Sequence, residues 1–190
     1  MTYITSSFQE FIPNLEGFEH LPSEEITHLS KQLQPLRYRI GQKIIGKDKL
    51  PEQITILYEG KVRLLGYHPQ TQTPTTLKLL QPGAIIGEIS ILREVACETA
   101  IASTEVICLS LSKTEYLRLL ASYPDFANIR LNRTHLIEIF DVLSSQVQKQ
   151  ANAVLNLTEL VQQALSKAKI HYLNPGITPV IQLDSENIWF

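Results

Sequence analysis

The residues best suited to chemistry are five histidines and a serine, and their spacing argues against catalysis. No histidine has a cysteine or aspartate at the spacing of metal ligands. The histidines are His20, His28, His68, His135 and His171. Ser90 does not stand in a Gly-x-Ser-x-Gly motif, and no glycine-rich phosphate loop is followed by a lysine. The sequence therefore predicts neither an enzyme nor a metal site.

Composition narrows the class of protein further. Apolar residues make up 44% of the 190 residues and charged residues 19%, which is typical of a globular chain. The net charge is −2 with both signs interspersed, so we expect no nucleic-acid partner. Cys97 and Cys108 lie in apolar strand-like sequence and are expected to be buried free thiols, with a disulfide or metal site as the alternative. Without a signal peptide or a long apolar run, we expect a cytoplasmic location.

The first 111 residues of the chain divide into helices and then short strands. Residues 1–36 are predicted to be helical, with Ser23 as an N-cap followed by the acidic first-turn residues Glu24 and Glu25. Residues 37–111 are short β-rich runs separated by glycine and proline, which indicates a sandwich or barrel. Within them, residues 88–92 are predicted to form a single helical turn.

Residues 112–155 are predicted to form a short helix and then a long one from about Asp125 to Leu155. Ser112 and Glu115 fit a capping box at the first helix. The long helix carries a narrow heptad-like apolar seam. Its members are Ile129, Leu136, Phe140, Leu143, Val147 and Val154. We expect a homodimer through this seam, and the alternative is a helix that lies back on its own β-roll.

Residues 156–190 are predicted to hold one more helix and the start of a β-hairpin. Asn156 and Glu159 repeat the capping-box spacing, and the apolar run Ile188 to Phe190 ends the chain. Because an exposed apolar end favours aggregation, we expect a further domain to follow.

Four glycines then match a known family by position. Gly41, Gly60, Gly83 and Gly87 stand between apolar runs, in "RYRIGQKI", "ILYEGKVRLL" and "LLQPGAIIGE". Over roughly residues 8–150 the chain resembles the cyclic nucleotide-binding domains of the catabolite activator protein and of kinase regulatory subunits. The resemblance implies an α+β fold: a double-stranded β-helix (β-roll, jelly-roll-like) with amino-terminal helices and a long carboxy-terminal helix.

The resemblance also marks residues 86–101 as a phosphate-binding cassette. In the family, backbone N–H groups of a short helix bind the cyclic phosphate, and the carboxylate at the position of Glu88 accepts from the ribose 2′-hydroxyl. The candidate nucleotide-binding residues carried over in this way are Gly87, Glu88, Ile89, Ser90, Arg93, Cys97, Glu98 and Thr99.

The cassette departs from the family where the phosphate needs a cation. The family's arginine falls at Cys97, and Glu98 follows it. A charge-assisted hydrogen bond contributes about 1.5–3 kcal/mol, and about 1.4 kcal/mol changes an affinity tenfold. Arg93, in the intervening loop, is the alternative phosphate partner. The sequence therefore predicts a degenerate phosphate site.

Three functions follow from the resemblance. The first is a regulatory or docking module without a cofactor that controls an attached effector. The lead-in "SSFQEFIPNLEGFEHLP" also resembles the amino-terminal region of bacterial peptidase-containing ABC exporters, which would make the effector a membrane transporter and place this domain on its cytoplasmic side. The alternatives are a cyclic AMP or cyclic GMP sensor with an unusual cassette, and a transcription regulator of the Crp/Fnr type that lacks its DNA-binding part.

Overall fold

The computed structural model describes residues 2–68, 70–149 and 157–167. Eight strands form two antiparallel four-stranded sheets. The first sheet has the order β1 (Gln34–Tyr38), β8 (Val106–Ser112), β3 (Gln53–Glu59), β6 (Ile85–Ile86). The second has the order β2 (Lys43–Ile45), β7 (Thr99–Ala102), β4 (Val62–Tyr67), β5 (Pro74–Leu80). The predicted β-roll is confirmed.

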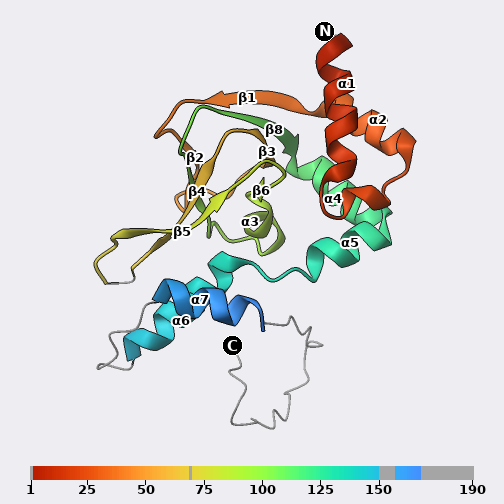
Figure 1. Ribbon diagram of the computed structural model, residues 1–190. Helices are drawn as coiled ribbons and strands as arrows, with labels where there is room; N and C mark the ends of the chain where they lie inside the picture. Colours follow the sequence, from red (N-terminus) through yellow and green to blue (C-terminus); the bar gives the residue numbers. More distant parts are fainter. Residues whose placement is uncertain (1, 69, 150–156, 168–190) are drawn as a thin grey trace, which may run out of the picture.

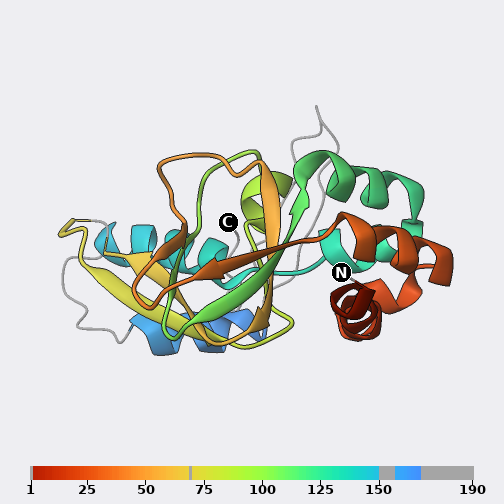
Figure 2. The same cartoon turned by 90° about the horizontal axis from the view of Figure 1, so that it is seen from above.

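Helices flank the roll at both ends of the chain. They are α1 (Thr2–Phe11), the 3₁₀ turns η1 (Ile12–Asn14) and η2 (Phe18–His20), α2 (Ser23–Gln32), α3 (Glu88–Leu92), α4 (Lys113–Ser122), α5 (Pro124–Leu131), α6 (Leu136–Lys149) and α7 (Leu157–Leu165). Figures 1 and 2 show α1, α2, α4 and α5 together at one end of the roll. In both views α6 and α7 lie side by side beneath β4 and β5.

Three apolar clusters hold these parts together. One joins α1, α2, α4 and α5 to β3 and β8, and it includes Phe18, Leu29, Tyr116 and Phe126. A second fills the space between the two sheets, and a third joins β4, β5 and α3 to α6 and α7. The helices are therefore packed on the roll through continuous cores, and they fix the position of α3 from both sides.

Of the two N-caps predicted from the sequence at α4 and α2, the structure shows the first and not the second. The Ser112 hydroxyl accepts a hydrogen bond from the Glu115 backbone N–H at 3.2 Å, so the predicted cap of α4 is confirmed. Ser23 is instead the first residue of α2, and the capping position falls on Pro22. The Pro22 ring presets φ for the turn into the helix but supplies no side-chain acceptor.

The prediction of one long helix over residues 125–155 is wrong. The chain leaves the helix after Leu131 and begins α6 at Leu136. Arg130 and Leu136 are both buried on either side of the break, Arg130 in its ion pair with Glu88 and Leu136 in the apolar cluster shared with α7. A straight helix cannot bring both residues into those places, so the chain turns between them.

The apolar seam packs inside the chain. Leu136, Phe140 and Leu143 are buried against Leu64 of β4 and Val161 of α7, which is the alternative arrangement for this helix. The Phe140 ring lies over Gly66, where an added Cβ would come within 2.5 Å of it. Ile129 lies on α5, beyond the break. The Val147 and Val154 side chains lie outside the described residues, as do the predicted hairpin and chain end.

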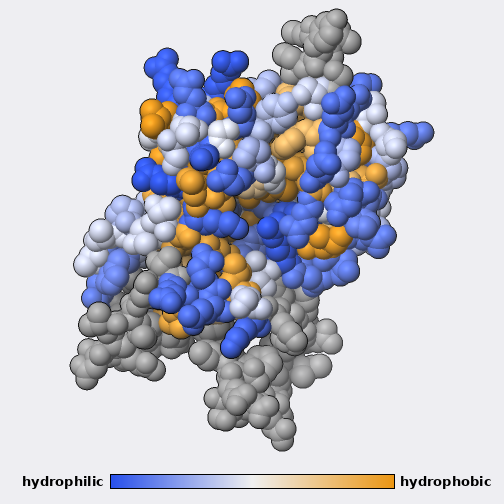
Figure 3. Space-filling view, viewed as in Figure 1, coloured by the Kyte–Doolittle hydropathy of each residue, from blue (hydrophilic) through white to orange (hydrophobic). Residues whose placement is uncertain are grey.

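The described surface is mostly hydrophilic. Figure 3 shows one face with charged and polar residues over most of it and smaller apolar areas between them. The large exposed apolar side chains are Ile40, Leu79, Val95 and Leu117. They lie on separate elements, and no helix among the described residues has the length and apolar character needed to cross a bilayer.

Candidate ligand site

The cassette segment folds as a glycine turn followed by one short helix. Gly87 has φ of +86°, and a Cβ there would lie 3.2 Å from the Ile45 side chain and 3.3 Å from the Gln53 carbonyl oxygen. Only glycine avoids both the left-handed strain and this contact. The helix α3 then runs from Glu88 to Leu92, which are the bounds predicted for the helical turn.

Glu88 is buried in an ion pair that the sequence did not reveal. Its side chain is 2% exposed and that of Arg130, on α5, is 1% exposed. Arg130 Nε donates to Oε1 of Glu88 at 2.6 Å, and its terminal nitrogen donates to Oε2. The Tyr116 hydroxyl, on α4, donates to Oε1 as well. The carboxylate that was predicted to bind the ribose therefore already holds two other helices of the chain, α4 and α5.

The ion pair with Glu88 keeps Arg130 charged in the protein interior. Burial opposes the charge on Arg130, but its hydrogen bonds to Glu88 offset this effect and raise the pKa of the guanidinium. Burial, and then the neighbouring Glu88 carboxylate, raise the pKa of the Tyr116 hydroxyl. Both groups are therefore donors to Glu88 at neutral pH. Neither Tyr116 nor Arg130 was predicted as a site residue, although Arg130 follows Phe126 by four residues on one helix face.

Glu98 turns back toward α3. Its Oε2 accepts from the Ser90 hydroxyl at 3.1 Å and lies 3.4 Å from the Ser90 backbone nitrogen. The Ser90 hydroxyl in turn lies 3.3 Å from the Cys97 backbone nitrogen and 3.4 Å from the Cys97 sulfur. Residues 90, 97 and 98 thus form one internal network at the segment where the family holds the cyclic phosphate.

The position of Glu98 has an electrostatic cost. Burial raises its pKa to about 7, even though hydrogen bonds from the backbone of Gly87 and from Ser90 lower it. Glu88 nearby raises it further. At neutral pH the side chain therefore exists in both its neutral and its charged form. Burial also raises the pKa of the Cys97 thiol, which keeps it in its neutral form, and a thiol in either form carries no positive charge.

The remaining predicted residues lie outside the polar network. Arg93 donates to Glu138 of α6 at 2.7 Å, so it ties α6 to the loop after α3. Ile89 is buried in the apolar cluster beneath α6, and Thr99 is buried at the start of β7. Of the eight predicted site residues, Glu88 and Glu98 line the cavity beside the cassette.

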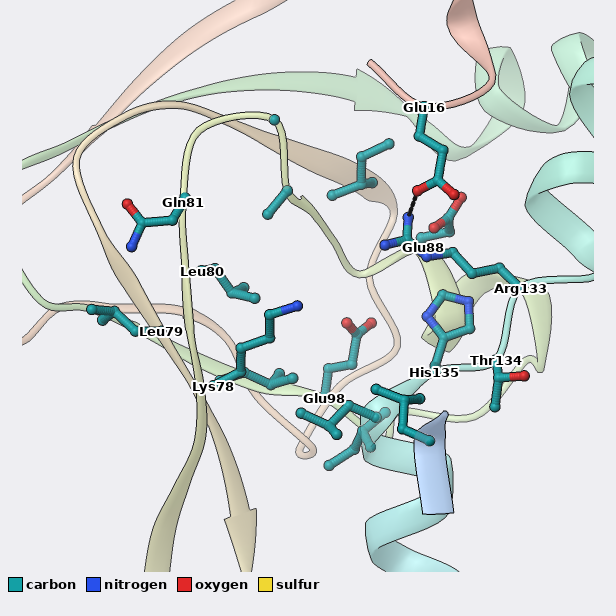
Figure 4. Close-up of a pocket in the computed structure, with 17 residues that line it drawn as sticks. Glu16, Lys78, Leu79, Leu80, Gln81, Glu88, Glu98, Arg133, Thr134 and His135 are labelled. Atoms are coloured by element: carbon teal, nitrogen blue, oxygen red, sulfur yellow. Dashed lines mark ion pairs between the residues drawn. The ribbon is translucent and has the colours of Figure 1, made fainter. Parts of the chain in front are cut away.

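This cavity has a volume of about 380 Å³ and lies between β5, α3 and α6. Figure 4 shows the side chains of Lys78, Glu98 and His135 pointing into one space, with Glu88 behind it. Arg133 lies at its edge and pairs with Glu16 at 2.7 Å. Lys78 and His135 were not predicted as site residues, because only the fold brings β5 and the α5–α6 break to the cassette.

Comparisons with known proteins agree with this architecture. Residues 35–123 match the model of the cyclic nucleotide-binding domain. The cyclic AMP receptor protein of Thermus thermophilus is 28% identical over 171 residues, which are 87% of this chain and 73% of that protein. The fold is therefore that of a cyclic nucleotide-binding β-roll.

Two solved structures share the fold at low identity. The regulatory domain of Toxoplasma gondii PKA with cAMP has a TM-score of 0.60 at 19% identity, over 78% of this chain and 51% of that one. A regulatory subunit of a cAMP-independent protein kinase A from Trypanosoma cruzi, bound to guanosine, has a TM-score of 0.52 at 23% identity, over 66% of this chain and 48% of that one. The chain spans about half the length of these two proteins.

Proposed function

We propose that this chain is a regulatory or docking module whose cassette does not hold a cyclic phosphate. The observation that carries the proposal is the place of Glu98, beside the hydroxyl and backbone nitrogen of Ser90, where a phosphate would need those groups. Cys97 precedes it in place of the family's arginine. A cyclic nucleotide would bring a negative charge to a carboxyl group and find no guanidinium there.

The expected loss of affinity is large. Removing a charge-assisted hydrogen bond costs about 1.5–3 kcal/mol, which is roughly a tenfold to 150-fold loss. The ionised fraction of Glu98 adds repulsion, because the like charges of the carboxylate and the phosphate are poorly screened in a buried site. Arg93 does not restore the cation, since it pairs with Glu138 on α6. Binding at physiological concentrations of cyclic nucleotide is therefore not expected.

Titration calorimetry of the full chain with cyclic AMP and cyclic GMP tests this function. We expect no binding at micromolar concentrations. The double variant Cys97→Arg with Glu98→Ser is expected to gain binding, because it restores the cation and removes the carboxyl group. Glu24→Ser, an exposed change on α2, is the matched control and is expected to gain nothing. Micromolar binding by the unchanged protein would overturn the proposal.

The second candidate is a sensor for a cyclic nucleotide. It is favoured by Lys78, which lines the cavity and forms no ion pair within the described part of the chain. The fold does not decide between ligands, since one solved relative is described with cAMP and another with guanosine. If cyclic nucleotides bind, Lys78→Gln is expected to weaken them about tenfold, and an unchanged affinity would exclude this role for Lys78.

The effector of the module stays a proposal. An attached transporter is suggested by the amino-terminal sequence alone, and a transcription regulator is favoured by the 28% identity to a bacterial cyclic AMP receptor protein. Homodimer formation also stays a prediction, and three residues of the seam expected to carry it are buried within the chain. Sedimentation equilibrium over a range of protein concentrations distinguishes a monomer from a dimer.

A further inference from the structure

One wall of the cavity between β5, α3 and α6 consists of aliphatic side chains. They come from two strands and two helices, and they are Leu64, Leu80, Leu136, Ile137 and Leu165. A heterocyclic base against this wall would lose the water on its ring nitrogens and gain no side-chain partner, which is unfavourable. A hydrocarbon group has no hydrogen bonds to lose there. The wall therefore favours a ligand with a hydrocarbon body over one with a nucleobase.

The polar side of the cavity carries an excess of positive charge. Lys78 forms no ion pair within the described part of the chain. Glu98 carries only part of a negative charge at pH 7, because burial raises its pKa to about 7. The other acidic side chains along the cavity are paired, Glu88 with Arg130 and Glu16 with Arg133. This balance favours a ligand with a single negative charge.

Hydrogen-bond donors on this side suit a carboxylate. Figure 4 shows Lys78 and His135 pointing into the cavity on either side of Glu98. Nε2 of His135 is buried without a partner among the described residues, and burial lowers the pKa of the ring, so that it is neutral at pH 7. In the tautomer with its hydrogen on Nε2 it donates, as do the Lys78 ammonium group and the neutral form of Glu98. A carboxylate has about four acceptor sites for these donors and needs none from α3.

We infer that this cavity binds a compact monocarboxylic acid with a hydrocarbon body, its carboxylate held by Lys78 and His135 and its body against the aliphatic wall. The inference rests on the proposed function, because it assumes that no cyclic nucleotide fills the cavity. The volume of about 380 Å³ is at the small end of the range for small-molecule pockets, so the ligand is compact. The module would then respond to an organic acid.

A set of matched ligands tests the inference on the unchanged full chain. Octanoate, 1-octanol and octylammonium share one hydrocarbon chain and differ in charge, and acetate has the carboxylate without the chain. Calorimetry at pH 7 measures each affinity. We expect octanoate to bind at one molecule per chain and 1-octanol to bind about tenfold more weakly, because it lacks the charge-assisted hydrogen bonds. Octylammonium and acetate are expected not to bind.

Two variants with matched controls test the assigned contacts. Lys78→Gln is expected to weaken octanoate about tenfold and to leave 1-octanol unchanged. Lys31→Gln, an exposed change on α2, should affect neither ligand. Leu165→Ala is expected to weaken octanoate and 1-octanol by the same factor, because both bury the same hydrocarbon chain. Leu117→Ala, on the exposed side of α4, should weaken neither, and circular dichroism confirms that each variant is folded.

The outcomes separate this inference from the proposed function. If octanoate does not bind at millimolar concentration and cyclic nucleotides do not bind either, the inference is wrong and the proposed function stands. If a cyclic nucleotide binds at micromolar concentration, the proposed function fails and this inference fails with it. If 1-octanol binds as tightly as octanoate, or if Lys78→Gln binds octanoate as well as the unchanged protein, the assignment of the carboxylate to Lys78 is wrong.

Discussion

Arg130 and Glu88 form a buried ion pair in which the guanidinium contacts both carboxylate oxygens, with Nε 2.6 Å from Oε1. Forty-two positions separate the two residues, and they lie on α5 and α3. The resemblance to cyclic nucleotide-binding domains predicts that the same carboxylate is the partner of a ribose hydroxyl. In this chain one side chain therefore serves the cavity and the attachment of the carboxy-terminal helices at once.

Removing Arg130 should destabilise the whole domain. Arg130→Met leaves Glu88 buried without its cation, which costs about 3–5 kcal/mol in the free energy of unfolding. Urea denaturation measures the loss. Arg133→Met is the control, because Arg133 is 42% exposed and its pair with Glu16 contributes about 1 kcal/mol or less. Equal, small losses in the two variants would contradict the structural role of the Arg130–Glu88 pair.

Glu98 should make stability depend on pH. Its pKa is about 7 in the folded protein and 4.5 for the ordinary group, so the folded state binds the proton more tightly. This contribution is fully present below pH 4.5 and is lost as the pH rises to about 7, with a total of roughly 3 kcal/mol.

Glu98→Gln is therefore expected to flatten the decline in stability between these two pH values. Urea denaturation at a series of pH values measures the slope for the unchanged protein and the variant. Glu24→Gln changes the same kind of group at an exposed position, and it should keep the slope. Identical slopes for Glu98→Gln and the unchanged protein would show that Glu98 is ionised in the folded state as in the unfolded chain.

The docking of α6 should depend on the contact between Phe140 and Gly66. Phe140→Ala removes a buried ring and is expected to cost about 3–5 kcal/mol. Gly66→Ala places a Cβ within 2.5 Å of that ring and should also destabilise the protein. In the double variant the clash is absent, so the two losses should not add, and thermal denaturation of the four proteins measures this coupling. If the losses of stability in the two single variants simply add in the double variant, Phe140 and Gly66 are not in contact.

The N-cap of α4 allows a test with a smaller expected effect and a matched serine as control. Ser112→Ala removes the hydroxyl that accepts from the Glu115 N–H, and about 1 kcal/mol of stability should be lost. Ser23→Ala, at the first position of α2, removes no side-chain cap and should change stability by a few tenths of a kcal/mol. Chemical denaturation distinguishes the two. A larger loss for Ser23→Ala would mean that Ser23 is the cap.

The sequence predicted the roll well because its turns carry local signals. Gly87 and the helix from Glu88 to Leu92 follow from a glycine with positive φ and an acidic first-turn residue. Glycine and proline separate the strands at regular spacing, so the approximate positions of the strands along the chain needed no long-range information. That Cys97 stands at the position of the family's arginine is likewise a prediction from the sequence, and it stays a prediction.

The carboxy-terminal helices were predicted less well, for a physical reason. The break between Leu131 and Leu136 contains no glycine or proline, so no local signal marks it. The residues Leu136, Phe140 and Leu143 have the same spacing whether they face a second copy or the roll. Only the tertiary contacts of Phe140 with Gly66 and of Arg130 with Glu88 decide between these arrangements, and such contacts join residues far apart in the chain.

The guanidinium of Arg130 also donates to the backbone carbonyl of Glu16, at 3.0 Å, between the two 3₁₀ turns near the amino terminus. One rigid planar group thus joins the chain's leading segment, the cassette and the junction before α6. A displacement of the leading segment would strain the donors that Glu88 depends on, and a change at Glu88 would be felt at Glu16. Through Arg130, the segment at Glu16 and the cassette helix are therefore both tied to the end of α5, next to the bend in the chain before α6.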